Sequence, residues 1–224
     1  MKILFTKKLN EKEVSEQLGT EISCDFVEVI KVNYKTVKPF DLGNYSLIFT
    51  SVNGVDAFFK NGFKPDENFV DKHFNKIYCV GKKTKLQLRK YGYGVFKLKK
   101  NAKELSEFII ENCAKERFLH FCGNLALDIL QKKLPLQNIG YQKIIIYDTE
   151  LLYPKIEKEY DAVAFFSPSG VRSFLKHNLL NFNKIFSIGE TTTSEILNFT
   201  KQKVFTAKEN DLMALLNLIK VETK

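Results

Sequence analysis

The chain contains an internal repeat. The segment Leu47–Phe59 (LIFTSVNGVDAFF) returns as Val163–Leu175 (VAFFSPSGVRSFL), so that the two copies begin 116 residues apart. A second pair of segments follows these copies, since Lys76–Thr84 (KIYCVGKKT) returns as Lys184–Thr192 (KIFSIGETT). Self-similarity with two long-period copies predicts a pair of similar domains rather than a solenoid. Because paired domains commonly hold a ligand between them, we expect an inter-domain binding cleft.

Strand-like and helix-like segments alternate along the whole chain. Apolar runs such as Ile144–Tyr147 have the length of strands, whereas segments such as 102–113 have the spacing of helices. Asn10 is expected to cap a helix that continues to Leu18 and stops at Gly19. Strict alternation predicts a parallel sheet with helices on both faces. We therefore expect an α/β fold of two similar flavodoxin-like domains, joined by a two-stranded β connection.

The order of the repeated segments predicts that one domain is inserted into the other. Lys2–Phe5 resembles Phe118–Phe121, but the first precedes its partner segments and the second follows them. The simplest explanation is that residues 34–149 form one complete domain. The outer domain is then discontinuous and consists of residues 1–33 and 150–224. Strands near residues 26–32 and 144–152 are expected to carry the chain across.

The chain is strongly basic, with a net charge of +9 over 224 residues. Nearly all of this charge comes from lysine, because only Arg89, Arg117 and Arg172 are arginines among the 35 basic residues. Arginine supplies the bidentate fork used in nucleic-acid recognition, and the lysines form no run longer than two. A solvated lysine-rich surface is the leading interpretation. Attraction of a polyanionic small molecule comes next, and nucleic-acid binding comes last.

Other features favour a cytoplasmic protein. No apolar run approaches the roughly 18 residues of a membrane span, and Met1–Thr6 has the pattern of a strand rather than of a signal peptide. Cys24, Cys79, Cys113 and Cys122 show no paired spacing, which indicates reduced thiols. We expect a cytoplasmic monomer.

Small polar residues follow the predicted strands in both copies of the repeat. In open parallel sheets, ligands bind at the carboxyl ends of strands, where loops lead into helices. A helix N-terminus at this edge offers free N–H groups and partial positive charge, which favour carboxylates and phosphates. The candidates are Thr50, Ser51, Asn53 and Thr84 in the first copy and Ser167, Ser169, Gly170, Thr191 and Thr192 in the second. Helix capping is the better explanation of any one position, but four matched sites favour an anionic ligand.

The chain lacks the sequence patterns of common catalytic sites. His73, His120 and His177 have no spacing typical of metal ligands, and no phosphate-binding glycine motif follows a strand. We therefore expect neither a metal nor a cofactor. Tyr147, at the end of the run Ile144–Tyr147, is the best single candidate, because a phenol can donate a proton or hydrogen bond to a leaving oxygen. A half-buried structural tyrosine explains this position equally well.

Several motifs occur in a specific order. They are Ile48–Ser51 with Asn53 and Val55, Val80–Gly81 with Thr84, Cys122–Asn124, Val163–Val171, and Ile188–Gly189 with Thr191 and Thr192. Their order and spacing resemble the uroporphyrinogen-III synthase family over nearly the whole chain. That resemblance implies two similar domains joined by two strands. It also implies a cyclising hydro-lyase of tetrapyrrole and haem biosynthesis, which closes hydroxymethylbilane into uroporphyrinogen III with inversion of ring D and loss of water. The family needs no metal or cofactor.

The resemblance also implies roles for individual residues. The family's tyrosine near the domain connection aligns with Tyr147, and it assists departure of the hydroxyl to give an azafulvene that closes through a spiro intermediate. The implied substrate-binding residues are Thr50, Ser51, Asn53, Thr84, Gly123, Asn124, Ser167, Ser169, Gly170, Thr191 and Thr192. The expected partner is hydroxymethylbilane in the inter-domain cleft, with neither nucleic acid nor membrane.

Two other functions remain open. The chain could be a catalytically silent tetrapyrrole-binding or sensory module, which the match at Tyr147 disfavours. It could instead be a basic nucleic-acid-binding protein, which the shortage of arginine disfavours. Identification of the product isomer tests the first alternative, and salt-dependent binding to DNA tests the second.

Overall fold

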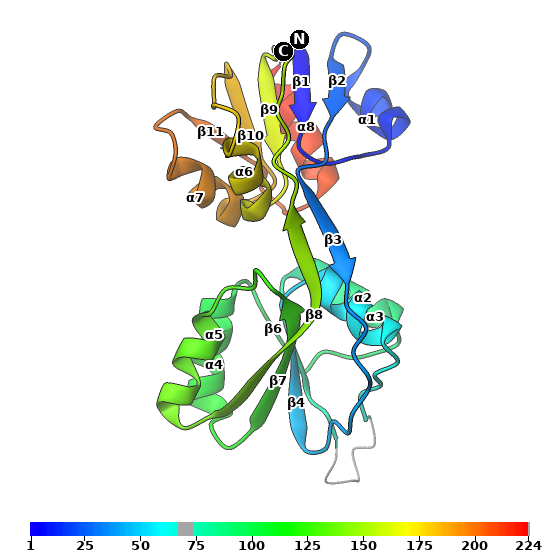
Figure 1. The fold of residues 1–224 in the computed structure, drawn as a ribbon, viewed down its shortest axis with the longest axis vertical. Coiled ribbons are helices and arrows are strands. Elements are labelled where there is room, and N and C mark those ends of the chain that lie inside the picture. Colours follow the sequence, from blue (N-terminus) through cyan, green and yellow to red (C-terminus); the bar gives the residue numbers. More distant parts are fainter. Residues whose placement is uncertain (67–73, 224) are drawn as a thin grey trace. The chain divides into compact units, whose positions relative to one another are not determined.

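The computed structural model describes residues 1–66 and 74–223, and its contacts divide the chain into two units. Unit 1 consists of Met1–Lys31 and Glu150–Lys224, and unit 2 is Val32–Thr149 (Figure 1). The chain passes between the units within two strands, β3 (Ile30–Tyr34) and β8 (Gly140–Leu151). None of the helices among the described residues is long and apolar enough to span a bilayer.

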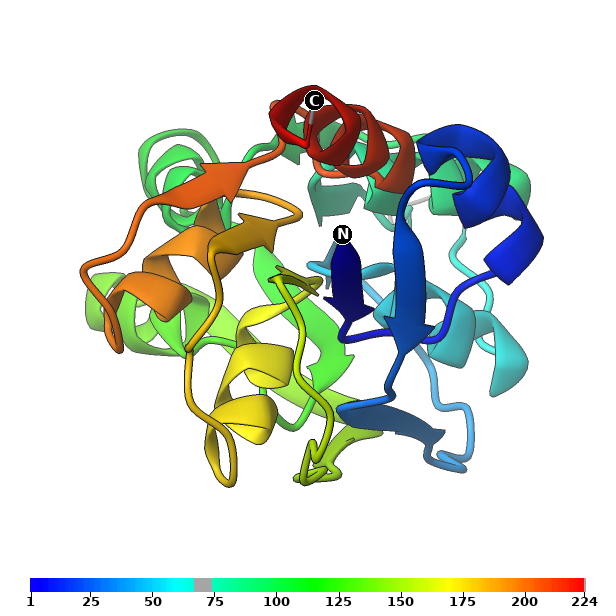
Figure 2. The ribbon, with the colours of Figure 1, turned by 90° about the horizontal axis from the view of Figure 1, so that it is seen from above.

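Unit 1 contains a five-stranded sheet in the order β11-β10-β9-β1-β2, and its neighbouring strands are parallel. Its strands are β1 (Lys2–Phe5), β2 (Ser23–Phe26), β9 (Ala162–Phe165), β10 (Lys184–Ser187) and β11 (Val204–Thr206). Its helices are α1 (Glu11–Leu18), α6 (Pro168–Leu175), α7 (Glu190–Leu197) and α8 (Leu212–Glu222). Figure 2 shows α1 and α8 on one side of these strands and α6 and α7 on the other.

Unit 2 contains a six-stranded sheet in the order β3-β8-β7-β4-β5-β6. Its other strands are β4 (Tyr45–Phe49), β5 (Ile77–Val80), β6 (Lys97–Lys99) and β7 (Arg117–Gly123). Its helices are α2 (Val52–Lys60), α3 (Lys82–Lys90), α4 (Ala102–Asn112), α5 (Ile129–Lys133) and the short 3₁₀ helix η1 (Pro135–Gln137). Strands β4 to β8 pair in parallel, whereas β3 runs opposite to β8, as Figure 1 shows.

The two sheets share one spatial order despite their different chain order. The order β2-β1-β9-β10-β11 of unit 1 matches β8-β7-β4-β5-β6 of unit 2. The repeated segments occupy equivalent strands, because β4 corresponds to β9 and β5 to β10. In unit 1 the β1–β2 pair precedes these strands in the sequence, and in unit 2 the equivalent β7–β8 pair follows them. The prediction of a parallel α/β fold is confirmed.

Alternating apolar side chains attach helices to both faces of each sheet. In unit 2, Phe49 packs in a core with Phe58 of α2, whereas its neighbour Ile48 packs in a second core with Leu105 of α4. Unit 1 repeats this arrangement, because Phe5 and Leu4 belong to cores on opposite faces. Each unit therefore builds its own core around its own sheet.

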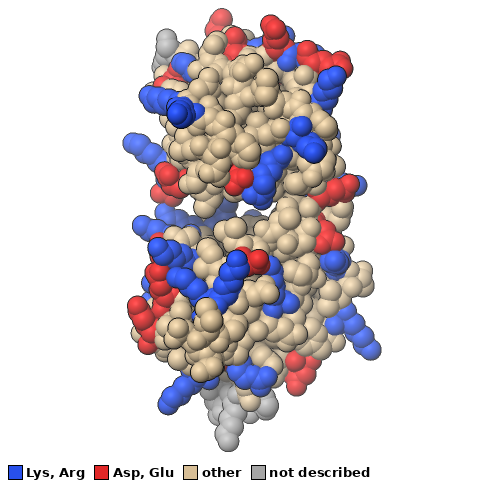
Figure 3. Space-filling view, turned by 60° about the vertical axis from the view of Figure 1, so that its left-hand side comes forward, with Lys and Arg blue, Asp and Glu red and all other residues tan. Residues whose placement is uncertain are grey.

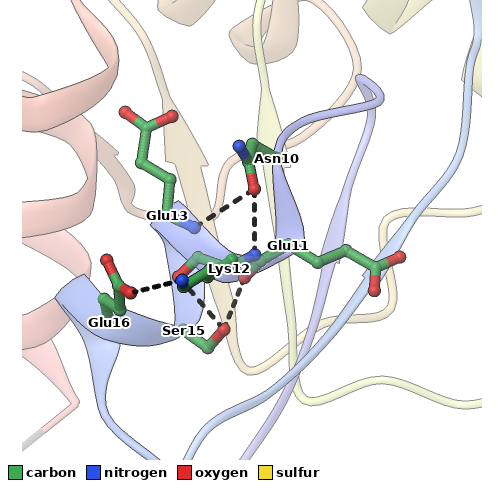
Figure 4. Close-up of polar contacts among 6 residues, drawn as sticks. All are labelled: Asn10, Glu11, Lys12, Glu13, Ser15 and Glu16. Carbon is green, nitrogen blue, oxygen red and sulfur yellow. Dashed lines mark hydrogen bonds and ion pairs between the residues drawn. The ribbon is translucent and has the colours of Figure 1, made fainter.

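Helix α1 begins and ends where the sequence predicted. The Asn10 side chain accepts hydrogen bonds from the backbone N–H groups of Lys12 at 3.1 Å and Glu13 at 3.4 Å (Figure 4). The helix stops at Gly19, whose φ of +87° suits a residue without a side chain. Glu11 and Glu13 lie in the first turn, where their charges favour the positive end of the helix dipole. The Asn10 cap and the two glutamates therefore stabilise this N-terminus.

Candidate functional site

The carboxyl ends of β4 and β7 form a topological switch point in unit 2. The two strands are parallel neighbours, yet α2 after β4 and α5 after β7 pack on opposite faces of the sheet. Phe58 of α2 lies in the core with Phe49, and Leu130 of α5 lies in the core with Ile48. Loops that diverge in this way leave room for a ligand at the strand ends. Thr50 and the end of β7 flank this point.

Ser51 and Tyr147 meet at the switch point. The Ser51 Oγ lies 3.0 Å from the Tyr147 Oη, although 96 residues separate the two in the sequence. Ser51 is also the N-cap of α2, because its Oγ accepts the backbone N–H of Gly54 at 3.0 Å. A Cβ at Gly54 would lie 2.8 Å from the backbone oxygen of Phe121, so only glycine lets α2 approach β7 so closely.

A β-bulge brings the Tyr147 side chain to Ser51. Cys122 pairs with Ile145, but the next β7 residue, Gly123, pairs with Tyr147, so Ile146 has no partner on β7. Tyr147 consequently packs in the same core as Ile146, next to α2. Strict alternation would have put consecutive residues on opposite faces. The bulge thus re-aims the side chain, as bulges beside functional sites often do.

The Tyr147 phenol is buried, and its pKa is raised. Its ring is buried to 8% exposure, and a Cβ at Gly123 would lie only 2.4 Å from its Cε2. Burial raises the pKa of Tyr147, although the hydrogen bond from Ser51 works against this increase. The Ser51 Oγ accepts the Gly54 N–H and keeps its own O–H, so either hydroxyl can be the donor in the contact between Ser51 and Tyr147. When Ser51 donates, the phenol hydrogen of Tyr147 is available to an acceptor on a ligand.

The loop after β7 is fastened to β8 at both ends. Asn124 donates its backbone N–H to the Tyr147 carbonyl at 3.2 Å, and its Oδ1 accepts the Thr149 N–H at 2.8 Å. Farther along, Lys143 donates to the Ala126 carbonyl at 3.1 Å and pairs with Asp128 at 3.0 Å. The Asn124 side chain therefore holds this loop beside Tyr147.

A second set of hydrogen-bonded side chains, which the sequence did not predict, lies at the end of β4. The Thr50 Oγ1 lies 2.9 Å from the His120 Nε2, and the His120 Nδ1 lies 2.7 Å from the Tyr141 Oη. His120 is 1% exposed. The spacing of the histidines argued against a metal-ligand role and suggested no other role for His120. The sequence feature that indicates its role is its place in the strand Phe118–Phe121. A histidine in such an apolar strand is expected to be buried and therefore to need polar partners.

The repeated segment Lys76–Thr84 contains β5 and the first residues of α3. The Thr84 side chain is buried and Asn53 is half-buried in the first turn of α2. Gly81, with a φ of +84°, precedes α3, and no side chain caps this helix. The first turn of α3 thus presents backbone N–H groups at a strand end, next to Lys82 and Lys83.

Unit 1 repeats the capping geometry without the tyrosine contact. Ser167 caps α6 by accepting the Gly170 N–H at 3.0 Å, the same distance as in the Ser51 cap. The Ser167 Oγ lies 3.2 Å from the Ser169 Oγ, whereas Ser51 contacts Tyr147. In the first turn of α7, Thr191 is exposed and Thr192 is buried. The structure thus brings Ser51, Gly123, Asn124 and Tyr147 together in unit 2, and Ser167, Ser169 and Gly170 in unit 1, whereas the Thr50 side chain contacts His120 instead.

Lysine and arginine side chains are spread over both units on the face that Figure 3 shows. The described residues contain no cluster of three or more histidine, cysteine or acidic side chains suited to a metal ion. His73 lies outside the described residues. Burial raises the pKa of Cys122, beside the switch point, to about 12, which leaves an inert thiol.

Comparison with known proteins decides the family. The model of the uroporphyrinogen-III synthase family matches residues 31–217, which is most of the chain. The chain belongs to the uroporphyrinogen-III synthase family. This membership confirms the resemblance seen in the sequence. Members of this family are cyclising hydro-lyases of haem biosynthesis that act on hydroxymethylbilane. The family match supports the activity of a uroporphyrinogen-III synthase for this chain.

Solved structures agree with the family assignment at the level of the fold. A uroporphyrinogen-III synthetase from Helicobacter pylori is 18% identical, with a TM-score of 0.66, and the match covers 100% of this chain and 99% of that one. A mutant uroporphyrinogen III synthase from Thermus thermophilus is 14% identical, with a TM-score of 0.71 and full coverage of both chains.

Proposed function

We propose that the Ser51–Tyr147 pair carries the acid step in the conversion of hydroxymethylbilane into uroporphyrinogen III. The observation that supports this proposal is the 3.0 Å contact between the two hydroxyl groups at the switch point of unit 2. Tyr147 is buried, and its raised pKa keeps the phenol protonated at neutral pH. A protonated phenol with a hydrogen directed away from Ser51 is suited to donate to a departing oxygen.

The chemistry needs one such donor. The terminal C–O bond of the bilane breaks, and the leaving hydroxyl gains a proton or a hydrogen bond from Tyr147. Loss of the pyrrole N–H proton gives the azafulvene and replaces the proton that Tyr147 supplied, so that the hydroxyl and one proton leave the substrate as water overall. The azafulvene is then attacked through the spiro intermediate that inverts ring D. Ser51 can keep the Tyr147 oxygen hydrogen-bonded while the phenol gives up its hydrogen, because its O–H donates to that oxygen.

We also propose that helix N-termini bind the carboxylates of the substrate. The positions are Thr50, Ser51, Asn53, Thr84, Gly123, Asn124, Ser167, Ser169, Gly170, Thr191 and Thr192. Thr84 and Thr192 are buried, at 3% and 1% exposure, and the Thr192 N–H donates to the Gly189 carbonyl at 3.0 Å, so these two residues would contribute by fixing the first turns of α3 and α7. Gly123 contributes through the close packing of Tyr147 against its backbone. A net charge of +9 suits a substrate with eight carboxylates.

We propose further that the chain forms two separate domains, one of residues 1–33 with 150–224 and one of residues 34–149, which nearly coincide with units 1 and 2. Each unit has its own cores around its own sheet, which supports independent folding. The fragment 34–149 expressed alone should unfold in one cooperative transition in urea. A fragment with no cooperative transition would contradict this division.

The product isomer tests the activity directly. Hydroxymethylbilane closes unaided without ring inversion and gives isomer I, so isomer III reports the enzyme independently of the rate. Fresh substrate is mixed with the protein, the products are oxidised, and the isomers are separated by chromatography. We expect isomer III to predominate without added metal or nucleotide. Isomer I alone, formed at the rate of the protein-free control, would refute the proposal. Retained binding of uroporphyrinogen would then favour the catalytically silent module.

A further inference from the structure

The chain Thr50–His120–Tyr141 lies on the face of the unit 2 sheet opposite to the Ser51–Tyr147 pair. His120 pairs across the ladder with Ile48, and Tyr141 packs against the core that contains Ile48. Thr50 comes two residues after Ile48 and so shares its face. The distances are 2.9 Å from the Thr50 Oγ1 to the His120 Nε2 and 2.7 Å from the His120 Nδ1 to the Tyr141 Oη.

His120 is a neutral imidazole with both nitrogens engaged. Burial and, to a smaller extent, the charge of Lys143, its partner across the ladder, together lower its pKa to about 3. A neutral imidazole has one donor nitrogen and one acceptor nitrogen. The two hydrogen bonds must therefore run in one direction, either from Tyr141 towards Thr50 or from Thr50 towards Tyr141.

The geometry favours the direction from Tyr141 to Thr50. A phenol is a stronger donor than an aliphatic hydroxyl, because its oxygen lone pair is delocalised into the ring. The shorter contact, 2.7 Å, lies on the Tyr141 side, which suits a phenol O–H donated to the Nδ1. The 2.9 Å contact is the usual length of an N–H donated to an oxygen, here from the Nε2 to the Thr50 Oγ1. The Thr50 oxygen then accepts from His120, and its own hydrogen is left for another acceptor.

We propose that Tyr141 and His120 are positioning residues that make the half-buried Thr50 hydroxyl a one-way hydrogen-bond donor to a carboxylate of the bound tetrapyrrole. The identity of the ligand rests on the proposed function, whereas the direction of the two hydrogen bonds at His120 does not. Thr50 and Ser51 are consecutive, so the end of β4 would carry two oriented hydroxyl groups. The Thr50 hydroxyl is oriented by His120 on one face of the sheet. The Ser51 hydroxyl contacts Tyr147 on the other face.

The direction of the two hydrogen bonds is measured by the nitrogen NMR spectrum of the imidazole rings. The protein has only three histidines, so ¹⁵N-histidine labelling with His120→Asn as the assignment control isolates the His120 ring. We expect the Nε2–H tautomer of His120, with a signal that does not titrate between pH 5 and pH 9. Tyr141→Phe should move the Nδ1 signal towards that of a nitrogen without a hydrogen bond and leave the Nε2–H in place. Tyr45→Phe removes a phenol oxygen near the start of β4 and should leave the spectrum unchanged. An Nδ1–H tautomer in the unmodified protein would overturn the proposal.

The contribution to binding is measured with substitutions at Thr50. Thr50→Val keeps the shape and removes the hydroxyl, whereas Thr50→Ser keeps the hydroxyl. We expect Thr50→Val to raise the KM for hydroxymethylbilane by about 10-fold or more with kcat nearly unchanged, since one hydrogen bond to a charged group is lost. Thr50→Ser should stay close to the unmodified protein, and Tyr141→Phe should raise KM by a smaller factor. Equal KM values for the Val and Ser variants would overturn the proposal. The spectrum needs no substrate, so failure to form isomer III would count against the proposed function without deciding the direction of the chain.

Discussion

Replacing Gly123 by alanine tests how tightly the Tyr147 ring is held. A Cβ at Gly123 would lie 2.4 Å from the Tyr147 Cε2 and 2.5 Å from its Cζ. Relief of this overlap requires a shift of about 1 Å, because nonpolar carbons rarely approach within ~3.4 Å. The ring is buried at 8% exposure among the core residues of α2 and β7, so it cannot rotate into solvent without opening that core.

The shift has two measurable consequences. The Ser51–Tyr147 contact is 3.0 Å, and a displacement of about 1 Å away from Ser51 would end the hydrogen bond. The rate of isomer III formation should then fall about as far as it does for Tyr147→Phe, which is roughly 100-fold for loss of one positioned acid. The free energy of unfolding should also fall by about 1–3 kcal/mol, the usual cost of overpacking a core.

The assay combines product analysis with urea denaturation. Adding Gly123→Ala to Tyr147→Phe should cost no further activity, because both substitutions act through the same phenol. Gly94→Ala is the matched control, since a Cβ at Gly94 meets nothing within 4 Å. If Gly123→Ala forms isomer III at the normal rate and unfolds at the normal urea concentration, the ring is not confined as the structure indicates.

Three further predictions concern single side chains. Tyr147→Phe should lower kcat by roughly 100-fold or less and leave KM nearly unchanged, and Ser51→Ala should reproduce part of this loss, both measured as isomer III formation. Asn10→Ala should lower the free energy of unfolding by about 1 kcal/mol in urea, because two N–H groups of α1 lose their acceptor. His120 has a folded pKa of about 3, below its unfolded value of about 6.5, so only the unfolded chain takes up this proton as the pH falls between those values. This contribution to stability is complete above about pH 6.5 and decreases by about 1.4 kcal/mol per pH unit below it, so His120→Asn should flatten the acid side of the stability profile. An unchanged acid slope in His120→Asn would contradict the buried neutral state.

Much of the fold could be predicted because it depends on local patterns. The alternation of strand and helix segments is enough to predict parallel sheets with two covered faces, since each apolar segment must be buried on both sides. The cap at Asn10 and the stop at Gly19 depend on the chemistry of a few neighbouring residues. Less regular segments were harder. The segment between β7 and β8 contains two short helices, α5 and η1, with Asn138 in a left-handed conformation between η1 and β8.

The site depended on features with no local signature. Alternation along Ile144–Tyr147 puts Tyr147 on the face opposite to Ile146, and only the bulge against Gly123 reverses that assignment. The pairing of His120 with Thr50 likewise depends on the register between β4 and β7, which are separated by more than sixty residues. The sequence showed which residues were polar at strand ends, but not which of them touch.

The sequence alone determined the repeat, the α/β class and the set of polar residues at the strand ends, because each of these follows from residue type and spacing. Tertiary structure decided that Ser51 meets Tyr147, that Gly123 packs against its ring, and that His120 joins Thr50 to Tyr141. The physical reason is that strand register and a single bulge set these contacts. Both depend on the packing of whole sheets, where a shift of one residue moves every following side chain to the other face.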